Sequence, residues 1–162
     1  MTKYIFDLDD TIWDCFSSEG SATFGKYLTP PFRAEGDTVV DSKLSVCYLH
    51  EGVKSILENL RADSQDVGFL SLGAKPQTAM EEQPSVLLLK AFGIYKFFNA
   101  EKILDYYLDE NDMRITKERY LKDIGPCVFI DDDDTMLESA RNVPGVKAID
   151  RKTMGSWKRI FD

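Results

Sequence analysis

Two carboxylates, Asp7 and Asp9, follow a short apolar run at residues 4–6 near the start of the chain. The run consists of β-favouring residues, which predicts a buried central strand with both acids at its carboxyl end. In an open parallel sheet, ligands bind outside that end. On a regular strand, residues two apart point to one face, and two carboxylates about 4 Å apart repel by roughly 4 kcal/mol at a surface-like dielectric. We therefore expect a cation or a shared proton at this pair.

A second acidic cluster, Asp131 to Asp134, follows another apolar run at residues 127–130. Four successive carboxylates are costly unless a cation or a helix N-terminus stabilises them. Residues 135–141 are typical of a helix, whose first N–H groups can bind Asp133 or Asp134. Asp131 and Asp132 then remain as candidate partners of the opening pair.

Two weaker signals lie between the acidic clusters. The apolar run at residues 67–73 predicts a second strand with Ser71 near its end. A helix is predicted at residues 117–124, with Thr116 as its N-cap and Lys117 at its start. Serine ends many strands and most lysines are solvated, so each signal is weak by itself.

In this order along the chain, the four signals resemble the motifs of the haloacid dehalogenase superfamily, whose phosphatases use an aspartate nucleophile. The Asp-Leu-Asp-x-Thr-x-Trp opening, the Asp-Asp fourth motif and the lack of a large insertion are similar to its small capless magnesium-dependent phosphatases. The resemblance implies hydrolysis of a phosphomonoester through an aspartyl phosphate on Asp7, with Asp9 as general acid and base. The longer segment after Trp13 departs from that pattern.

The resemblance also implies a Mg²⁺ cofactor between the first and the last motif. Its ligands would be Asp7, Asp132 as the first choice with Asp131 as its support, and the backbone carbonyl of Asp9. Magnesium suits these positions, because the candidate ligands are all oxygen atoms and the substrate supplies another.

The two middle motifs imply contacts with the phosphoryl group of the substrate. The Ser71 hydroxyl and the nearby backbone N–H groups of Leu72 and Gly73 would hold a phosphoryl oxygen. Lys117 would neutralise the nucleophile and the phosphate, with Arg114 as the alternative. The sequence leaves open whether the substrate is a small-molecule phosphomonoester or a phosphoprotein, and it leaves the oligomeric state open.

Two other classes of function remain possible. A phosphoacceptor receiver domain also combines strand-end acids, Mg²⁺, a hydroxyl residue and a lysine. Its acid pair and its acceptor aspartate lie on different strands, however, and nothing acidic ends the strand predicted at residues 67–73. The third class is a non-catalytic binding protein on a decayed scaffold of the same superfamily. Turnover of an aryl phosphate with and without Mg²⁺ separates the three.

The alternation of strand and helix patterns predicts a single α/β domain over residues 1–162, with a doubly wound, Rossmann-like parallel sheet and helices on both faces. Residues 14–46 fit no helix template. We expect them to form a small flap over the site, with a hairpin within residues 38–46 and no large cap domain. A terminal helix is expected at residues 153–161.

Composition limits the partners and the compartment. A net charge of −8 argues against nucleic acid as a partner. No apolar run approaches the length of a membrane span and the N-terminus offers no signal peptide, so we expect a cytoplasmic protein without membrane contact. Cys15, Cys47 and Cys127 are odd in number and widely spaced, and we expect reduced thiols. His50, the sole histidine, is expected to make local hydrogen bonds.

Overall fold

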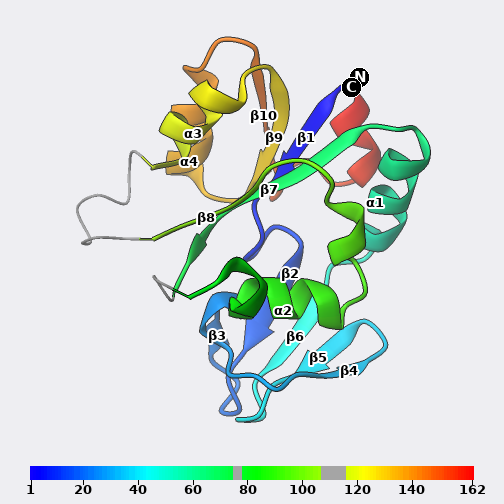
Figure 1. Cartoon of the computed structure of the whole chain (residues 1–162), viewed down its shortest axis with the longest axis vertical. Coiled ribbons are helices and arrows are strands. Elements are labelled where there is room, and N and C mark those ends of the chain that lie inside the picture. The colour runs from blue at the N-terminus through cyan, green and yellow to red at the C-terminus, as the bar shows by residue number, and fades with distance from the viewer. Residues whose placement is uncertain (75–77, 107–115) are drawn as a thin grey trace.

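The computed structural model describes residues 1–74, 78–106 and 116–162. One of its two sheets has five parallel strands in the order β10-β9-β1-β7-β8 (Figure 1). These strands are β1 (Lys3–Phe6), β7 (Asp66–Gly73), β8 (Lys102–Tyr106), β9 (Cys127–Asp131) and β10 (Val146–Asp150). The expected parallel α/β sheet is confirmed, and the strands expected at both acidic motifs are its central neighbours β1 and β9.

Helices cover both faces of this sheet (Figure 1). α3 (Thr116–Ile124) and α4 (Asp134–Arg141) lie on one face, where Leu121 and Ala140 pack with Ile5 of β1. α1 (Val53–Ala62) and the 3₁₀ helix η5 (Trp157–Phe161) lie on the other, and pack with Phe6. Burial on both faces explains why the central strands read as continuous apolar runs.

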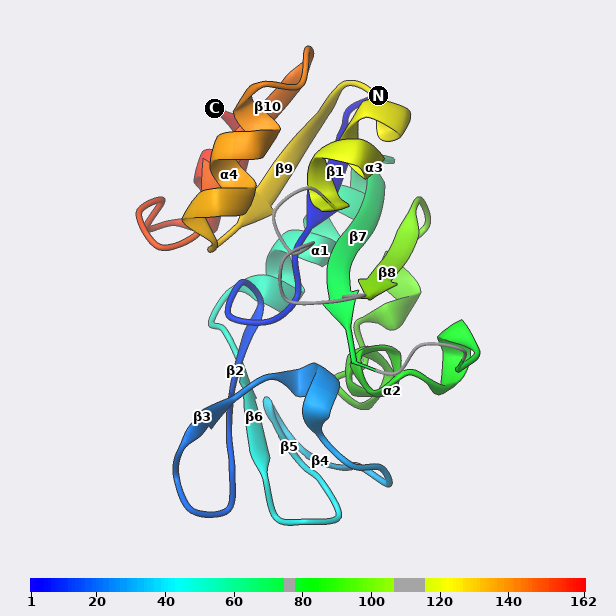
Figure 2. The same cartoon turned by 90° about the vertical axis from the view of Figure 1, so that its left-hand side faces the viewer.

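The segment after β1 folds into a second, antiparallel sheet of five strands in the order β3-β2-β6-β5-β4 (Figure 2). Its strands are β2 (Trp13–Phe16), β3 (Ala22–Thr23), β4 (Arg33–Glu35), β5 (Thr38–Val40) and β6 (Val46–Leu49). The expected hairpin is present as β5 and β6, and its turn is organised by Asp41, whose Oδ1 accepts hydrogen bonds from the N–H groups of Lys43 and Ser45. The expected flap is therefore a folded sheet insert.

Helix α2 (Pro84–Ala91) packs against the insert and holds it against the rest of the fold. It begins with proline in its first turn and packs against the insert's 3₁₀ helix η1 (Gly25–Tyr27). A Cβ on Gly25 would lie only 2.7 Å from Leu88 of this helix. Close contact with α2 thus fixes η1 beside the end of β1.

Two expectations were wrong. Cys15 and Cys47 form a disulfide, because they lie opposite each other on β2 and β6, although 32 positions separate them in the sequence. The free, buried cysteine in the described part of the chain is Cys127.

The terminal helix is shorter than expected. It is restricted to η5, since Gly155 has a positive φ of 69° that breaks a helix from residue 153.

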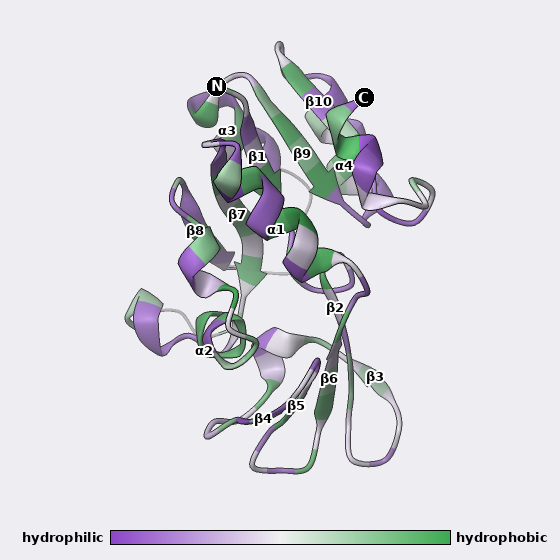
Figure 3. Ribbon diagram, turned by 90° about the vertical axis from the view of Figure 1, so that its right-hand side faces the viewer, coloured by the Kyte–Doolittle hydropathy of each residue, from purple (hydrophilic) through white to green (hydrophobic). Residues whose placement is uncertain are grey.

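Helices α1 and α4 carry both hydrophilic and hydrophobic residues, whereas the core strand β9 is mainly hydrophobic (Figure 3). Within the described residues, no helix combines the length and the hydropathy that a membrane span requires.

Candidate active site

The acidic motifs meet at the carboxyl ends of β1, β7 and β9. Asp7 directly follows β1, and its N–H donates to the carbonyl of Ile130 on β9 over 2.8 Å. A cavity of about 170 Å³ opens at this edge of the sheet. It is lined by Asp7, Asp9, Asp10, Phe24, Lys26, Ser71, Leu72, Lys117, Asp131, Asp132, Asp133 and Met136.

Three carboxylates of this cavity can share one cation. One oxygen from each of Asp7, Asp131 and Asp132 lies within 4.8 Å of the others, and Asp7 and Asp131 are buried. Burial, together with the charges of Asp7 and Asp131, raises the pKa of Asp132 to about 8. Burial and the Asp7 charge raise the pKa of Asp131 to about 6. Such mutual repulsion and an all-oxygen donor set fit a hard divalent cation.

Thr11 links two of these acids. Its Oγ1 lies 3.1 Å from Asp7 Oδ2 and 3.1 Å from Asp132 Oδ1. The sequence already showed Thr11 inside the opening motif, but a side-chain role for it was not anticipated. The threonine orients the carboxylates without adding charge.

Lys117 lies inside the acidic cluster. Its Nζ donates to Asp7 Oδ1 over 2.9 Å and to Asp131 Oδ2 over 2.5 Å, and the residue is only 3% exposed. Burial lowers the pKa of this ammonium group, but the charges of Asp7 and Asp131 outweigh it and raise the pKa above its ordinary value. Lys117 is therefore a fixed positive charge beside Asp7. Arg114, the alternative, lies outside the described residues.

Of the three residues predicted to contact the phosphoryl group, two line the cavity. The Ser71 hydroxyl donates to Asp7 Oδ1 over 3.1 Å, and Leu72 lines the cavity. Gly73 is absent from the lining residues described here, and a Cβ on it would lie 2.6 Å from the ring of Tyr106. A side chain at this position would therefore have to displace the Tyr106 ring on β8, so Gly73 permits this close packing.

Asp9 is held in a different way from Asp7. β1 ends at Phe6, so Asp7 and Asp9 lie beyond the regular strand, and the expectation that both point to one face of it does not apply. Asp10 turns the chain with a φ of 61°. Asp9 Oδ1 accepts hydrogen bonds from Trp13 Nε1 over 2.8 Å and from the N–H of Gly25 over 2.6 Å. Its Oδ2 is buried and has no hydrogen-bond partner among the described residues. Burial is the main cause that raises the pKa of Asp9 to about 6.

The insert adds two lining residues that the sequence did not reveal. Lys26 is buried, and its Nζ lies 4.9 Å from the centre of the Phe24 ring. Burial lowers the pKa of Lys26, while Asp9 and Asp7 oppose the shift. A lysine between two aromatic residues, Phe24 and Tyr27, was the available signal. This signal indicates a site residue only because the insert folds back onto the end of β1.

The remaining acids of the second cluster follow the sequence prediction. Asp133 caps α4, because its Oδ1 accepts from the N–H groups of Thr135 and Met136. Asp134 is exposed and pairs with Lys152 over 2.9 Å. The helix terminus and a surface lysine thus account for these two charges, and Asp131 and Asp132 face the cavity.

The crowded acids predict an unusual pH dependence of stability in the metal-free protein. The folded-state pKa values of Asp9, Asp131 and Asp132 lie above the ordinary value near 4, so the folded state binds more protons than the unfolded state between about pH 4 and pH 8. The free energy of unfolding is then greatest near the lower limit and falls as pH rises through these pKa values. We expect the melting temperature to drop by several degrees from pH 5 to pH 8.5, and less with Mg²⁺ present.

Calorimetry of two isosteric variants isolates this effect. Asp132→Asn should raise the metal-free melting temperature at pH 8.5 by about 2–6 °C, because it removes one charge from the cluster. Asp134→Asn is the matched control, since that carboxylate is exposed and paired with Lys152. Equal melting temperatures for the two variants at pH 8.5 would contradict the assignment.

Comparison with known proteins agrees with this geometry. A search of curated proteins found no match, whereas the model of the family described as Acid Phosphatase matches residues 2–144. The match includes both acidic motifs, the sheet insert and Lys117, and so covers most of the chain. The chain therefore belongs to the Acid Phosphatase family, a magnesium-dependent phosphatase family of the haloacid dehalogenase superfamily, and is a phosphomonoester hydrolase.

Proposed function

We propose that the protein hydrolyses phosphomonoesters in two steps, with Asp7 as nucleophile, Asp9 as general acid and base, and Mg²⁺ as cofactor. The observation that carries the proposal is the contrast between the two acids. Asp7 belongs to the cluster with Asp131, Asp132 and Lys117, whereas Asp9 has one buried oxygen without a partner among the described residues. Asp7 therefore faces the groups that would hold a cation, whereas Asp9 keeps a buried oxygen that can carry a proton.

The set of oxygen donors supports a position for the cofactor. Asp7, Asp131 and Asp132 would hold the ion, and Lys117 contributes a further positive charge on the same cluster. When bound, Mg²⁺ supplies positive charge that lowers the repulsion between the nucleophile and the phosphate dianion.

In the first step, an oxygen of Asp7 attacks phosphorus and the bond from phosphorus to the leaving oxygen breaks. The leaving oxygen takes the proton from Asp9 Oδ2. Lys117 and Ser71 hold Asp7 Oδ1 in place during the attack, so little reorganisation is needed. The product of this step is an aspartyl phosphate on Asp7 and a free alcohol or phenol.

In the second step, water attacks phosphorus while Asp9, now ionised, takes a proton from it. The bond between phosphorus and Asp7 breaks, inorganic phosphate leaves, and both acids return to their starting states. Trp13 and Gly25 hold Oδ1 of Asp9, so the same Oδ2 serves in both steps.

The metal assignment is tested by turnover of an aryl phosphate during a Mg²⁺ titration. Asp132→Ala should raise the Mg²⁺ concentration for half-maximal activity by at least about tenfold, because it removes one of three charged ligands. Asp134→Ala should leave that value within about twofold, as its carboxylate contacts Lys152 at the surface. Equal shifts for the two variants would refute the ligand assignment, and turnover unaffected by a chelator would refute the role of a metal.

Lys26 is proposed to bind the substrate. It lines the same cavity as Asp7 and is the cation that the insert contributes there, within the described residues. Lys26→Met should raise KM for an aryl phosphate by about tenfold, the value of one charge-assisted hydrogen bond, with a smaller change in kcat. Lys43→Met, on an exposed turn of the insert, is the control. An unchanged KM would exclude Lys26 from substrate binding.

A further inference from the structure

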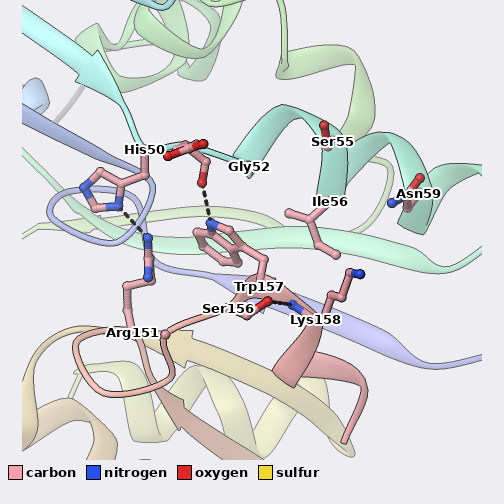
Figure 4. A pocket seen from close by; sticks show the side chains of 11 residues that line it. His50, Gly52, Ser55, Ile56, Asn59, Arg151, Ser156, Trp157 and Lys158 are labelled. Carbon is pink, nitrogen blue, oxygen red and sulfur yellow. Dashed lines mark hydrogen bonds between the residues drawn. The ribbon is translucent and has the colours of Figure 1, made fainter.

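A second cavity lies between the start of α1 and the segment after β10, away from the acidic site (Figure 4). Its volume is about 610 Å³, and none of its lining residues lines the acidic cavity. This volume is within the range of small-ligand sites. The buried side chains of Ile56 and Trp157 contribute an apolar floor.

Two cations line this cavity, Arg151 and Lys158, and in the described part of the chain neither forms an ion pair with a carboxylate. Their neighbour Lys152 behaves differently, since it pairs with both Asp134 and Asp150. In a chain with a net charge of −8, carboxylates are abundant, and Glu51 is the single acid among the lining residues. Asp14, which does not line the cavity, lies 2.9 Å from His50 Nε2. Among the lining residues themselves, two permanent cations face one acid.

The guanidinium of Arg151 makes three contacts with described residues. Its Nε donates to the carbonyl of Thr11 over 3.1 Å, its Nη2 lies 3.3 Å from His50 Nδ1, and it stacks 4.4 Å from the centre of the Trp157 ring. Figure 4 shows the His50 contact. Two of the five guanidinium N–H groups are engaged in these contacts, and the planar group is fixed by the ring beneath it.

The opposite wall of the cavity offers neutral polar groups. Ser55 and Asn59 are exposed on α1, and Lys158 extends toward Ile56 and Asn59 (Figure 4). We propose that this cavity is a second binding site, for a small hydroxylated organic anion whose phosphate or carboxylate head contacts Arg151 and Lys158. The hydroxyl groups of such a ligand would face Ser55 and Asn59.

Arg151 also connects this cavity to the acidic site. The residue whose carbonyl it binds, Thr11, has its hydroxyl 3.1 Å from Asp7 and from Asp132. A ligand that draws the guanidinium toward itself must therefore alter a contact of Thr11. The Thr11 backbone is therefore a second position, besides Trp157, at which ligand binding in this cavity can be measured.

The test is an NMR titration of the full chain, without metal, with 3-hydroxypropylphosphonate, whose carbon–phosphorus bond a phosphomonoesterase cannot cleave. The two indole N–H signals distinguish the cavities, because Trp157 Nε1 donates to the carbonyl of Glu51 and Trp13 Nε1 donates to Asp9. We expect saturable shifts of the Trp157 indole and of the Thr11 amide. A response of Trp13 alone, or no saturable response of Trp157, would overturn the proposal.

Two surface variants sharpen the result. Lys158→Ala removes an exposed charge from the cavity and should weaken binding of the phosphonate by at least about fivefold, the value of one partly exposed ion pair. Lys54→Ala makes the same change on an exposed position of α1 that does not line the cavity, and should stay within about twofold. Equal weakening would show only a general charge effect and would overturn the site, while both results leave the phosphatase mechanism untouched.

Discussion

Asp7→Asn is expected to reduce turnover of any phosphomonoester by at least about 10⁴-fold while the protein stays folded. The substitution replaces the attacking carboxylate by an amide of nearly the same volume. The amide oxygen can still accept hydrogen bonds from Lys117 and Ser71, which contact Asp7 Oδ1. The change therefore removes the nucleophile and leaves its surroundings in place.

The melting temperature distinguishes this loss of activity from unfolding of the protein. Asp7 repels Asp131 and Asp132, so the metal-free Asp7→Asn variant should melt at or above the temperature of the unmodified protein at pH 8.5. Asp123→Asn, an exposed isosteric change on α3, is the control for both measurements. Activity within about tenfold of the unmodified protein, in a sample free of contaminating phosphatase, would rule out Asp7 as the nucleophile.

The sequence was informative where chemistry depends on strand order. Asp7 and Asp131 are 124 positions apart, yet both follow apolar runs, and in a parallel sheet the carboxyl ends of neighbouring strands share one edge. Lys117 was predicted from the resemblance, because the third motif of the superfamily has a lysine at the start of the helix before this strand. Both predictions require only the order of the elements along the chain.

What the sequence could not supply depends on contacts between distant segments. The disulfide requires the register of β2 with β6, and Lys26 requires the insert to fold back on β1. The orientation of Asp9 is of the same kind, because one of its two hydrogen bonds comes from a backbone N–H at Gly25. Backbone donors carry no signature in the side-chain sequence.

Family membership decides between the classes of function that the sequence left open. A receiver domain has its acid pair and its acceptor aspartate on different strands, with the acceptor later in the chain. Here β7 ends near Ser71 instead of an acceptor aspartate, and the chain belongs to a phosphatase family. The proposed mechanism then depends on whether Asp9 donates and accepts a proton.

Asp9→Asn is the variant that tests this point. The amide can still accept hydrogen bonds from Trp13 and Gly25 through its oxygen, but it cannot donate a proton as an acid or accept one as a base. With an alkyl phosphate, whose leaving group needs protonation, we expect turnover to fall by about 10²–10⁴-fold. With an activated aryl phosphate the first step should lose much less, because a phenolate leaves without a proton.

The second step should be slow with either substrate, since water then lacks its base. Aspartyl phosphate on Asp7 should therefore accumulate in Asp9→Asn during turnover of the aryl phosphate, and rapid acid quench with radiolabelled substrate measures it. The double variant Asp7→Asn with Asp9→Asn is the control, because it has no carboxylate to phosphorylate at position 7. If no phosphoenzyme forms and both substrates slow by the same factor, Asp9 is not the acid and base. The hydrogen bonds of Trp13 and Gly25 to its Oδ1 would then serve only to hold the insert against β1.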